Sequence, residues 1–420
     1  MFKVFYLKYC DNNYIILLHK ICIMYEMEDF MHKTVNFGKR AIHAIVGYFK
    51  NTYKSLWLVV IACSVFSCML VYSATHSYGN RTVLVQIAAC VVGYIGAVII
   101  SLMDYERLGE LWWLVAGGCV FLVVLTLFIG VGASGEYSLA DDQAWLRIGG
   151  ISFQPSELMK IGFLITFPYH LSIVVRDKNL NSLPHLLMLL GHIAFPVGLI
   201  MLQGDHGTAL MFLCMAMVIF IGSGIDWKYL AGGFVAVLAA LPFVWQIMPT
   251  FQKERIRAVY NPRPGDEMGN LYQQNLGRMA IGSGGLTGEG WMQGRMTQSG
   301  LVPADHNDLV FTVAAEEFGL VGAMLVIGLL VAIMIMSLRT ALHARDTLGR
   351  FICLGFFGLI AAQTIFNLGM CLVVLPVIGI TLPFFSAGGS SSMCLYLGFG
   401  LVLSVHMRRN ETSMQFINMR

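Results

Sequence analysis

The sequence predicts an all-α polytopic membrane protein with about ten transmembrane helices and one long extracytoplasmic loop between the seventh and the eighth. Of the 420 residues, 57% are hydrophobic and only 12% are charged, and the mean hydropathy is +0.70. Soluble globular domains contain about 25% charged residues, so this composition excludes that class. The apolar residues also gather into runs of about 20 residues, the length that spans a bilayer. Because the chain has no basic block or nucleic-acid motif, we expect no nucleic-acid partner.

Ten apolar runs are expected to form the transmembrane helices. They lie near residues 56–74, 83–102, 111–131, 157–175, 184–202, 207–223, 229–248, 309–337, 351–373 and 386–407. An even number of spans places both termini on one side of the membrane. If that side is the cytoplasm, the short inner loops carry most of the arginines and lysines, as the positive-inside rule requires. We therefore expect both termini in the cytoplasm.

Composition divides the chain into three parts. Residues 1–54 form a basic arm, residues 55–408 a membrane domain and residues 409–420 a cytoplasmic tail. The arm is too long before the first span to be a cleavable signal peptide. Two interpretations of it stay open: a loose tail, which we favour, or an amphipathic helix near residues 32–48 on the membrane surface.

The long polar loop covers residues 249–308 and is expected on the outer face of the membrane. Its glycine-rich stretch, residues 277–290, is expected neither to continue a helix nor to bury a core. The loop ends at Asp308, directly before the eighth apolar run. A carboxylate held at the membrane boundary is a candidate site residue. The alternative interpretation is that Asp308 is the N-cap of the following helix.

A second candidate group contains Arg147, Glu157 and Lys160, which follow one another at the outer edge of the fourth span. Pro155 suits the first turn of a helix, so Glu157 and Lys160 lie three residues apart on one helical face. In one interpretation Lys160 and Arg147 bind a phosphate while Glu157 orients the lysine. In the other, Glu157 and Lys160 form a local ion pair at the helix N-terminus. The spacing supports both equally.

Asp205 lies in a tight outward turn between two spans, Gln203-Gly204-Asp205-His206-Gly207-Thr208. Aspartate before an apolar run usually caps the following helix, and we favour that interpretation. The alternative is a functional one, in which Asp205 holds a basic side chain or a metal ion.

Residues 375–392 contain two prolines and a Gly-Gly-Ser run, which interrupt helix near the outer face. The free amides there and the hydroxyls of Ser390 and Ser391 are suited to bind an anion; a plain loop explains the stretch equally well. Glu316 and Glu317 fall inside the eighth apolar run, where unpaired charge is costly. We expect them to be structural partners of arginines or of backbone groups.

Taken together, these segments resemble the SEDS family (shape, elongation, division and sporulation), the polytopic glycosyltransferases typified by RodA and FtsW. The resemblance covers roughly residues 55–408. Its motifs are Phe153-Gln154-Pro155-Ser156-Glu157 with Lys160, Asp205-His206-Gly207-Thr208, Pro303 to Phe311 with Glu316-Glu317-Phe318-Gly319, and Leu375 to Ser391. The resemblance implies ten spans in the bacterial cytoplasmic membrane and polymerisation of lipid II into the glycan strands of peptidoglycan on its outer face.

The chain departs from the family pattern at four positions. Gly204 and His206 stand where the family usually has Pro and Leu, Ala144 where it often has Arg, and Ala387 where it often has Tyr. Ala144 removes one possible phosphate contact and puts in doubt whether Arg147 substitutes for it. Ala387 and the loop 104–107 are closer to RodA than to FtsW. The resemblance therefore favours a role in cell elongation and shape, with division or sporulation as the alternative.

The resemblance also implies roles for the candidate residues. Asp308 matches the essential aspartate of the family and is expected to be the general base that deprotonates the attacking sugar hydroxyl. Positive charge beside the departing diphosphate is expected from Arg147 and Lys160, with Arg278 or Arg295 in addition. Glu157, Asp205, Ser390 and Ser391 complete the expected substrate-binding set. A divalent cation, Mg or Mn, is compatible with this chemistry, but no motif identifies its ligands.

The implied partner is a class B penicillin-binding protein, a single-span transpeptidase that crosslinks the strands. Two other functions remain alternatives. A transporter that flips lipid II also needs intramembrane charges and broken helices, but Asp308 lies at an outer loop edge rather than at midspan. A non-catalytic scaffold for a cell-wall synthase requires that Asp308 be dispensable.

Overall fold

The computed structural model describes residues 47–76, 79–132, 144–148, 151–269, 271–303 and 306–409. The chain divides into two compact units, residues 1–54 and residues 55–420. The second unit is the membrane domain. The interpretations of residues 1–46 and of the tail beyond residue 409 fall outside the described residues.

Ten helices in the described part of the chain are long and apolar enough to cross a membrane, which confirms the predicted fold class. They are α2 (Lys54–Thr75), α3 (Arg81–Leu102), α5 (Trp112–Ile129), α6 (Pro155–Arg176), α7 (Leu183–Leu202), α8 (His206–Ser223), α9 (Trp227–Ile247), α13 (Val310–Leu342), α14 (Thr347–Cys371) and α15 (Gly389–Met407). Most ends lie within about three residues of the predicted runs, because hydrocarbon thickness sets how long an apolar helix must be.

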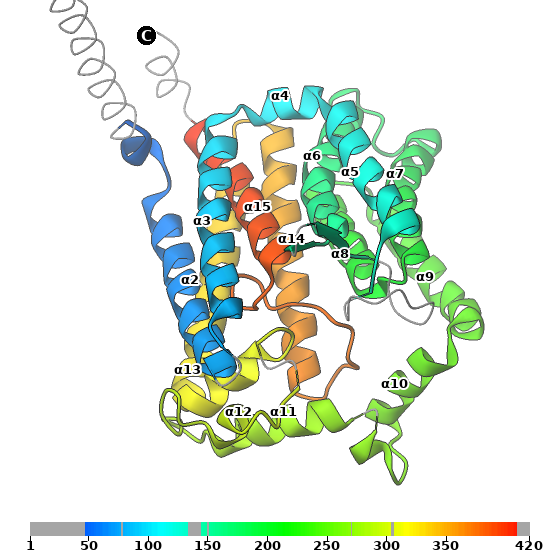
Figure 1. Cartoon of the computed structure of the whole chain (residues 1–420). Coiled ribbons are helices and arrows are strands. Elements are labelled where there is room, and N and C mark those ends of the chain that lie inside the picture. The colour runs from blue at the N-terminus through cyan, green and yellow to red at the C-terminus, as the bar shows by residue number, and fades with distance from the viewer. Residues whose placement is uncertain are drawn as a thin grey trace, which may run out of the picture. The chain divides into compact units, whose positions relative to one another are not determined.

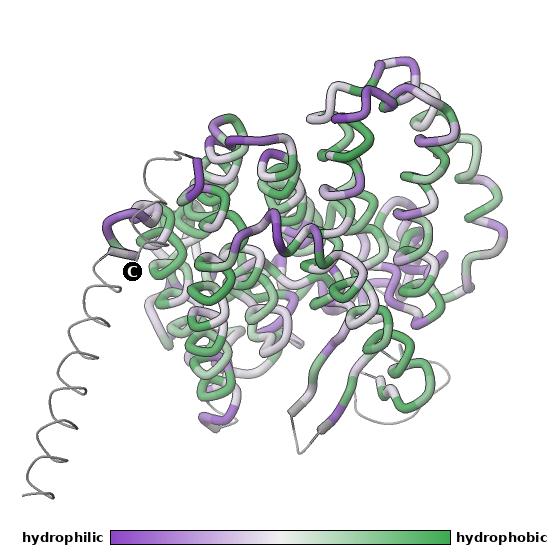
Figure 2. The backbone as a smooth tube through the Cα atoms, turned by 90° about the horizontal axis from the view of Figure 1, so that it is seen from above, coloured by the Kyte–Doolittle hydropathy of each residue, from purple (hydrophilic) through white to green (hydrophobic). Residues whose placement is uncertain are grey.

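The core of the membrane domain is formed by α15, α14 and α6. Within the most apolar 18-residue window of each helix, 89% of the residues of α15 are buried, 72% of those of α14 and 67% of those of α6. α15 packs along α3, α14 packs against α8 and α13, and α6 packs against α5, α14 and α15 (Figure 1). Hydrophobic residues cover most of these helices, whereas hydrophilic residues concentrate in the connecting segments (Figure 2).

α9 differs from the other spans because none of the residues in its membrane-spanning window is buried. Large apolar side chains such as Phe234, Phe243 and Trp245 are exposed along it. The helix closes its own backbone hydrogen bonds, so it is stable in hydrocarbon without a protein neighbour.

The outer loop contains short helices: α10 (Thr250–Tyr260), the 3₁₀ helix η2 (Asp266–Met268), α11 (Tyr272–Ser283) and α12 (Arg295–Gln298). The expectation that the glycine-rich stretch excludes helix was wrong for its first part, because α11 continues through Gly277. A Cβ atom at Gly277 would lie 3.1 Å from Cγ2 of Thr312 on α13. Glycine at this position therefore lets α11 pack closely on α13, and that contact offsets its low helix propensity.

The eighth span was expected as a single helix, but α13 is broken at Gly319. This residue has φ +66° and ψ −157°, outside the helical region. Leu320 N donates to Gly285 O at 3.0 Å, and Glu289 N donates to Glu316 O at 3.0 Å, so the outer loop takes up backbone groups that the break leaves unpaired. A short outer piece of helix and a longer span follow one another here.

Two small elements complete the description. The hairpin β1 (Leu146–Ile148) and β2 (Ile151–Phe153) is antiparallel, with Arg147 opposite Ser152, and leads directly into α6. The short helix α4 (Tyr105–Glu110) connects α3 and α5.

Candidate functional site

Asp308 lies in the turn before α13. The interpretation of Asp308 as a helix N-cap was wrong, because the N-cap position is Leu309 and no side chain caps this helix. The residue is half-buried, and its carboxylate accepts no hydrogen bond from the described residues. The side chain is therefore available for chemistry at the end of the membrane domain where α13 begins.

The backbone of Asp308 is held tightly although its side chain is not. Asn367, fully buried on α14, donates from Nδ2 to the carbonyl oxygen of Asp308 at 2.7 Å and to that of Ile380 at 2.8 Å. Ala387 N donates to His306 O at 2.8 Å. These bonds fix the Asp308 turn against the loop between α14 and α15, residues 372–388.

The surroundings of Asp308 suit a base. Burial raises the pKa of its carboxyl group to about 6, and the nearby His306 opposes part of that rise. A carboxylate with a pKa just below neutrality is mostly ionised at pH 7 and is a stronger base than an ordinary aspartate. These properties are compatible with a general base, and that role of Asp308 stays a prediction.

Asp205 caps α8, which confirms the favoured interpretation. Its Oδ1 accepts from Thr208 N at 2.9 Å, while Oδ2 accepts from Gln154 Nε2 at 2.8 Å and from Ser156 Oγ at 3.3 Å. Both oxygens are thus engaged, and they join the start of α8 to the start of α6. Substrate binding by Asp205 stays a prediction, and its visible role is to position the turn at Gln154.

The loop 372–388 also lies between the Asp205 turn and Asp308. A Cβ atom at Gly207 would lie 2.8 Å from the carbonyl oxygen of Ile378. Gly379, which follows Ile378 in the chain, has φ +73°, and a Cβ atom there would lie 3.9 Å from Oδ2 of Asp308. Glycine permits the close packing at position 207 and the positive φ at position 379. Two motifs that are far apart in sequence thus meet at the same loop.

Glu157 and Lys160 form the predicted ion pair, with Lys160 Nζ 2.9 Å from Glu157 Oε1. Both are buried within α6, at 5% and 2% exposure, and Oε2 of Glu157 has no hydrogen-bond partner. Lys160 has three donor hydrogens and only this one partner among the described residues. Such incomplete pairing of a buried charge is costly, which favours a further, anionic partner.

Ser390 and Ser391 lie in the first turn of α15, whose N-terminus has no side-chain cap. Ser391 Oγ is 3.0 Å from Thr381 Oγ1, whereas the buried Ser390 Oγ has no partner. An uncapped N-terminus with an unpaired hydroxyl suits an anion better than a plain loop would. α15 packs on α6, the helix that carries Glu157 and Lys160.

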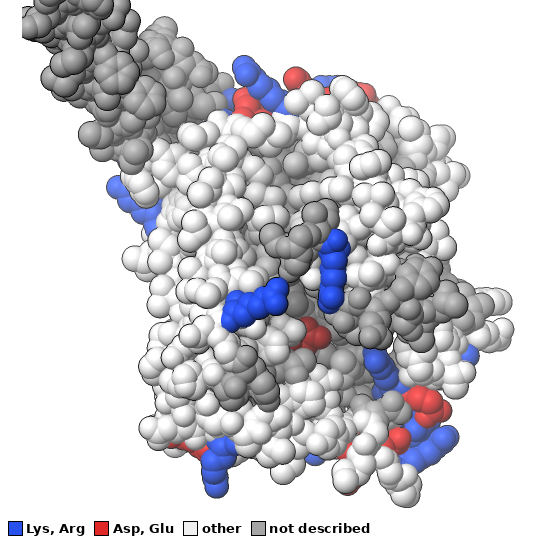
Figure 3. Space-filling model, in the orientation of Figure 1, with Lys and Arg blue, Asp and Glu red and all other residues white. Residues whose placement is uncertain are grey.

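The three arginines of the predicted set lie on separate elements: Arg147 on β1, Arg278 on α11 and Arg295 on α12. All three are exposed. Arg295 is bound to Glu289, with Nη2 2.8 Å and Nε 3.1 Å from Oε1. No hydrogen bond or ion pair of the described residues joins these arginines to Asp308. Figure 3 shows one face of the molecule, on which an acidic side chain lies in a hollow with basic side chains beside it.

Glu316 and Glu317 are structural, as expected. Glu316 accepts from Met296 N at 2.6 Å and from Thr297 N at 3.0 Å, both at the start of α12. Glu317 accepts from Ser73 Oγ at 2.5 Å and from Gln298 Nε2 at 3.1 Å. Thr297 Oγ1 also donates to Glu316, at 2.6 Å. Backbone amides, two hydroxyls and an amide side chain are thus their hydrogen-bond partners, rather than arginines.

Asn367 is the residue whose role sequence reasoning missed. Asn367 falls inside the ninth apolar run, near residues 351–373, and the sequence analysis assigned it no role. A polar side chain inside a span is costly unless it is bonded. That rule would have singled out Asn367, although it would not have identified Asp308 as its partner.

Among the described residues, no group of three or more His, Cys, Asp or Glu side chains is placed to hold a metal ion. Mg²⁺ in enzymes of phosphorylated substrates is often held by one or two carboxylates together with substrate phosphates. Asp308 provides one such carboxylate. The divalent cation stays a prediction.

The family model of the cell cycle proteins FtsW, RodA and SpoVE matches residues 53–411. The chain belongs to this family. The match reaches slightly beyond both ends of the region, 55–408, that the motifs indicated.

Three proteins show how similar this member of the FtsW, RodA and SpoVE family is to others. Peptidoglycan glycosyltransferase MrdB of Escherichia coli strain K12 is 30% identical over 362 residues, which are 86% of this chain and 94% of that protein. A chain from a solved peptidoglycan synthase complex, described as coordinating polymerization and crosslinking, has 29% identity and a TM-score of 0.71, with 86% of this chain and 99% of that chain covered. The crystal structure of the rod shape determining protein RodA of Thermus thermophilus has 28% identity and a TM-score of 0.61, with coverage of 85% and 97%.

Proposed function

We propose that this protein is a peptidoglycan glycosyltransferase that polymerises lipid II into glycan strands on the outer face of the bacterial cytoplasmic membrane. The observation that carries the proposal is Asp308. Its half-buried carboxylate has no hydrogen-bond partner among the described residues, and Asn367 holds its backbone. Membership of a family that includes proteins named peptidoglycan glycosyltransferase supports the same reaction.

In the proposed reaction Asp308 accepts the proton of the attacking sugar hydroxyl. The hydroxyl oxygen bonds to the anomeric carbon of the second substrate, and the bond from that carbon to the diphosphate breaks. The lipid diphosphate leaves with the bonding electron pair. Because a diphosphate is a good leaving group, positive charge beside it replaces a general acid.

Lys160 supplies part of that positive charge in the proposal. Glu157 orients it, and the amides and hydroxyls at the start of α15 bind phosphate oxygens. Arg147 and Arg278, which are exposed and have no partner among the described residues, are further candidates for diphosphate contacts. A bound Mg²⁺ or Mn²⁺ would neutralise diphosphate charge in the same place.

The multi-pass membrane architecture fits substrates with polyprenyl tails, which remain in the hydrocarbon while the sugars react at the surface. We propose that both termini face the cytoplasm, which the positive-inside pattern supports. We also propose a role in elongation and shape, supported by the similarity to MrdB and RodA, with division or sporulation as the alternative. A class B penicillin-binding protein is the proposed partner, supported by the similar chain from a synthase complex.

The deciding experiment is polymerisation of purified lipid II in the presence of the partner protein. We expect Asp308→Ala and Asp308→Asn to abolish polymer at native membrane abundance. Asp226→Asn is the matched control, because Asp226 is an exposed aspartate in the connection before α9 and its side chain makes no hydrogen bond. Polymer at the native rate from both Asp308 variants would remove this residue from the mechanism.

A lipid II transporter is the second candidate, and the break in α13 at Gly319 is the observation that favours it, since interrupted spans are typical of transporters. Lipid II with a fluorescent label, reconstituted in vesicles, separates the two functions. A transporter moves labelled lipid II across the bilayer, which changes how accessible the label is from outside the vesicle, and forms no polymer. A polymerase joins the labelled lipid II into glycan.

A further inference from the structure

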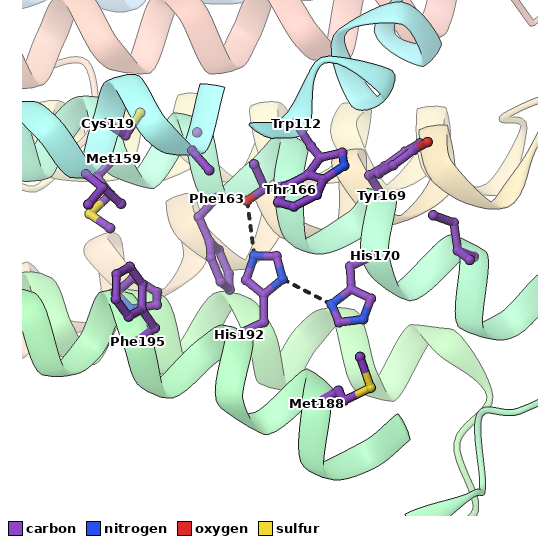
Figure 4. A pocket seen from close by; sticks show the side chains of 15 residues that line it. Trp112, Cys119, Met159, Phe163, Thr166, Tyr169, His170, Met188, His192 and Phe195 are labelled. Atoms are coloured by element: carbon purple, nitrogen blue, oxygen red, sulfur yellow. Dashed lines mark hydrogen bonds between the residues drawn. The ribbon is translucent and has the colours of Figure 1, made fainter. Parts of the chain in front are cut away.

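A cavity of about 630 Å³ lies between α5, α6 and α7, and none of its lining residues belongs to the candidate site. Ligand pockets are typically about 300–1,000 Å³. Trp112, Phe163 and Phe195 contribute aromatic walls (Figure 4). Trp112, Met188 and Phe195 are exposed on these membrane helices, so the cavity opens toward the bilayer. An occupant must therefore enter from the lipid.

Three polar side chains form a hydrogen-bonded chain in this apolar cavity (Figure 4). His192 on α7 has Nδ1 3.1 Å from Nδ1 of His170 on α6, and its Nε2 is 3.3 Å from Oγ1 of Thr166. The two imidazole rings are stacked, with centroids 5.3 Å apart. Polar groups inside a span are costly and usually serve a function. The ring of His192 also packs edge-on against Phe163 and Phe167 of α6, with centroids 6.0 and 5.6 Å apart. The proposed polymerase chemistry uses neither histidine.

The chain ends at Nε2 of His170, which has no hydrogen-bond partner in the described part of the protein. Between two uncharged imidazoles, one Nδ1 donates and the other accepts. If His170 donates from Nδ1, its Nε2 is an acceptor; if His192 donates, Nε2 of His170 carries the proton. A ligand group that both donates and accepts, such as a hydroxyl or an uncharged carboxyl group, matches either state.

We propose that this cavity binds a single-chain membrane amphiphile, a long-chain alcohol or an uncharged fatty acid, with its polar end at His170 and its hydrocarbon chain between the aromatic walls. His170 precedes Arg176, the inner end of α6, by six residues. At 1.5 Å per residue this is roughly 9 Å inside the membrane. A phosphate head group would lose its water at this depth, whereas a hydroxyl needs only the one or two hydrogen bonds that the imidazole supplies.

Photolabelling of the purified full chain in lipid nanodiscs tests this site independently of the polymerase reaction. The probes are a long-chain alcohol with a diazirine in its chain and the corresponding alkane without the hydroxyl. We expect the alcohol to label residues 155–176 and 183–202 about tenfold more than the alkane, since one hydrogen bond contributes about 1.4 kcal/mol. His170→Phe keeps an aromatic ring but removes both ring nitrogens, so it should reduce only the labelling by the alcohol.

Variants that fill the cavity, together with a matched control, identify it as the site of labelling. Ala116→Trp fills the cavity and should abolish labelling by the alcohol. Leu187→Trp is the matched control, because Leu187 is an exposed residue of α7 outside the lining and should leave labelling unchanged. If the Ala116→Trp variant does not purify as a monodisperse protein, Val120→Phe replaces it in the test, because Val120 also lines the cavity. Equal labelling by the alcohol and the alkane, labelling that survives filling, or a phospholipid mapped to this cavity would each overturn the proposal.

Discussion

At Asp308 the backbone and the side chain have different tasks. Asn367 fixes the position of the carbonyl group, while the carboxylate has no partner in the described part of the chain and remains able to accept a proton. Catalytic geometry is usually secured in this way, because a displacement of about 1 Å can reduce a rate roughly 100-fold. This separation leads to one prediction about the carboxylate of Asp308 and one about the hydrogen bond that holds its backbone.

The first prediction concerns pH. Burial raises the pKa of Asp308 to about 6, and the base is the ionised form, which is present above this pKa. Polymerisation should therefore fall as the pH drops through 6, to roughly one tenth of its plateau at pH 5. Initial rates between pH 5 and 8 measure this, with the Asp226→Asn variant expected to give the same profile. A rate that is constant from pH 5 to 7 would contradict a basic role for Asp308.

The second prediction concerns Asn367. Asn367→Asp keeps the shape but loses the donor to Asp308 O and Ile380 O, so kcat should fall about 10- to 100-fold with a smaller change in KM. Gln363→Ala, one turn earlier on α14, is the control, because Gln363 is also buried but has no bond to Asp308. Thermal stability of both variants shows whether the loss is general. A similar kcat for the two variants would reduce Asn367 to a packing residue.

Sequence reasoning reached part of this site. The position of Asp308 at a membrane boundary, the pairing of Glu157 with Lys160 and the capping by Asp205 follow from local spacing, which one helix or one turn decides. The hydrogen bond from Asn367 joins residues 59 positions apart. Such a contact depends on how helices pack, and a single sequence carries no local signal for it.

At the scale of elements, the outer loop and α13 form one structure. Gly288 and Gly319 each approach the other segment so closely that a Cβ atom would overlap backbone: at Gly319 it would lie 2.3 Å from Gly288 N. Glu316 then binds the start of α12. The loop is therefore packed on the break in α13, and the site residues on both sides of it depend on that packing.

Gly319→Ala tests this coupling. The positive φ and the contact with Gly288 N leave no room for a methyl group, so the variant should lose at least about 1–3 kcal/mol of stability and polymerase activity with it. Gly328→Ala is a matched control, since Gly328 lies on the same helix with open space around its Cβ position. Thermal unfolding in detergent measures the difference. Equal melting temperatures for the two variants would show that the break is not required.

The sequence predicted which elements exist better than it predicted how they bend. Span positions follow from hydropathy, because the bilayer imposes a minimum length on every crossing helix. The break at Gly319 escaped notice since isolated glycines are common in apolar spans. α11 was not predicted because its glycines suggested a loop. One of them, Gly277, instead allows α11 to contact Thr312 of α13.

For the whole molecule, the ten spans imply a fixed orientation that can be measured. We expect Ser299→Cys in the outer loop to react with a membrane-impermeant maleimide on intact cells, and His343→Cys after α13 to react only after permeabilisation. Both positions are exposed, and the eight cysteines of the described residues are buried or partly buried. The unaltered chain provides the background. Labelling of His343→Cys on intact cells would show that the orientation is the reverse of the predicted one.

The exposure of α9 has a mechanical consequence. Moving a helix sideways costs free energy mainly when buried contacts must be broken, and the membrane-spanning window of α9 has no buried residue. Its resistance to lateral displacement therefore comes from the lipid around it, from the chain at its two ends near Gly224 and Pro249, and from the hydrogen bond that Tyr229 Oη donates to Asn181 O at 2.8 Å. Because the other nine spans of the described residues all have buried residues in their windows, we expect α9 to be displaced most easily, and its position to depend on bilayer composition.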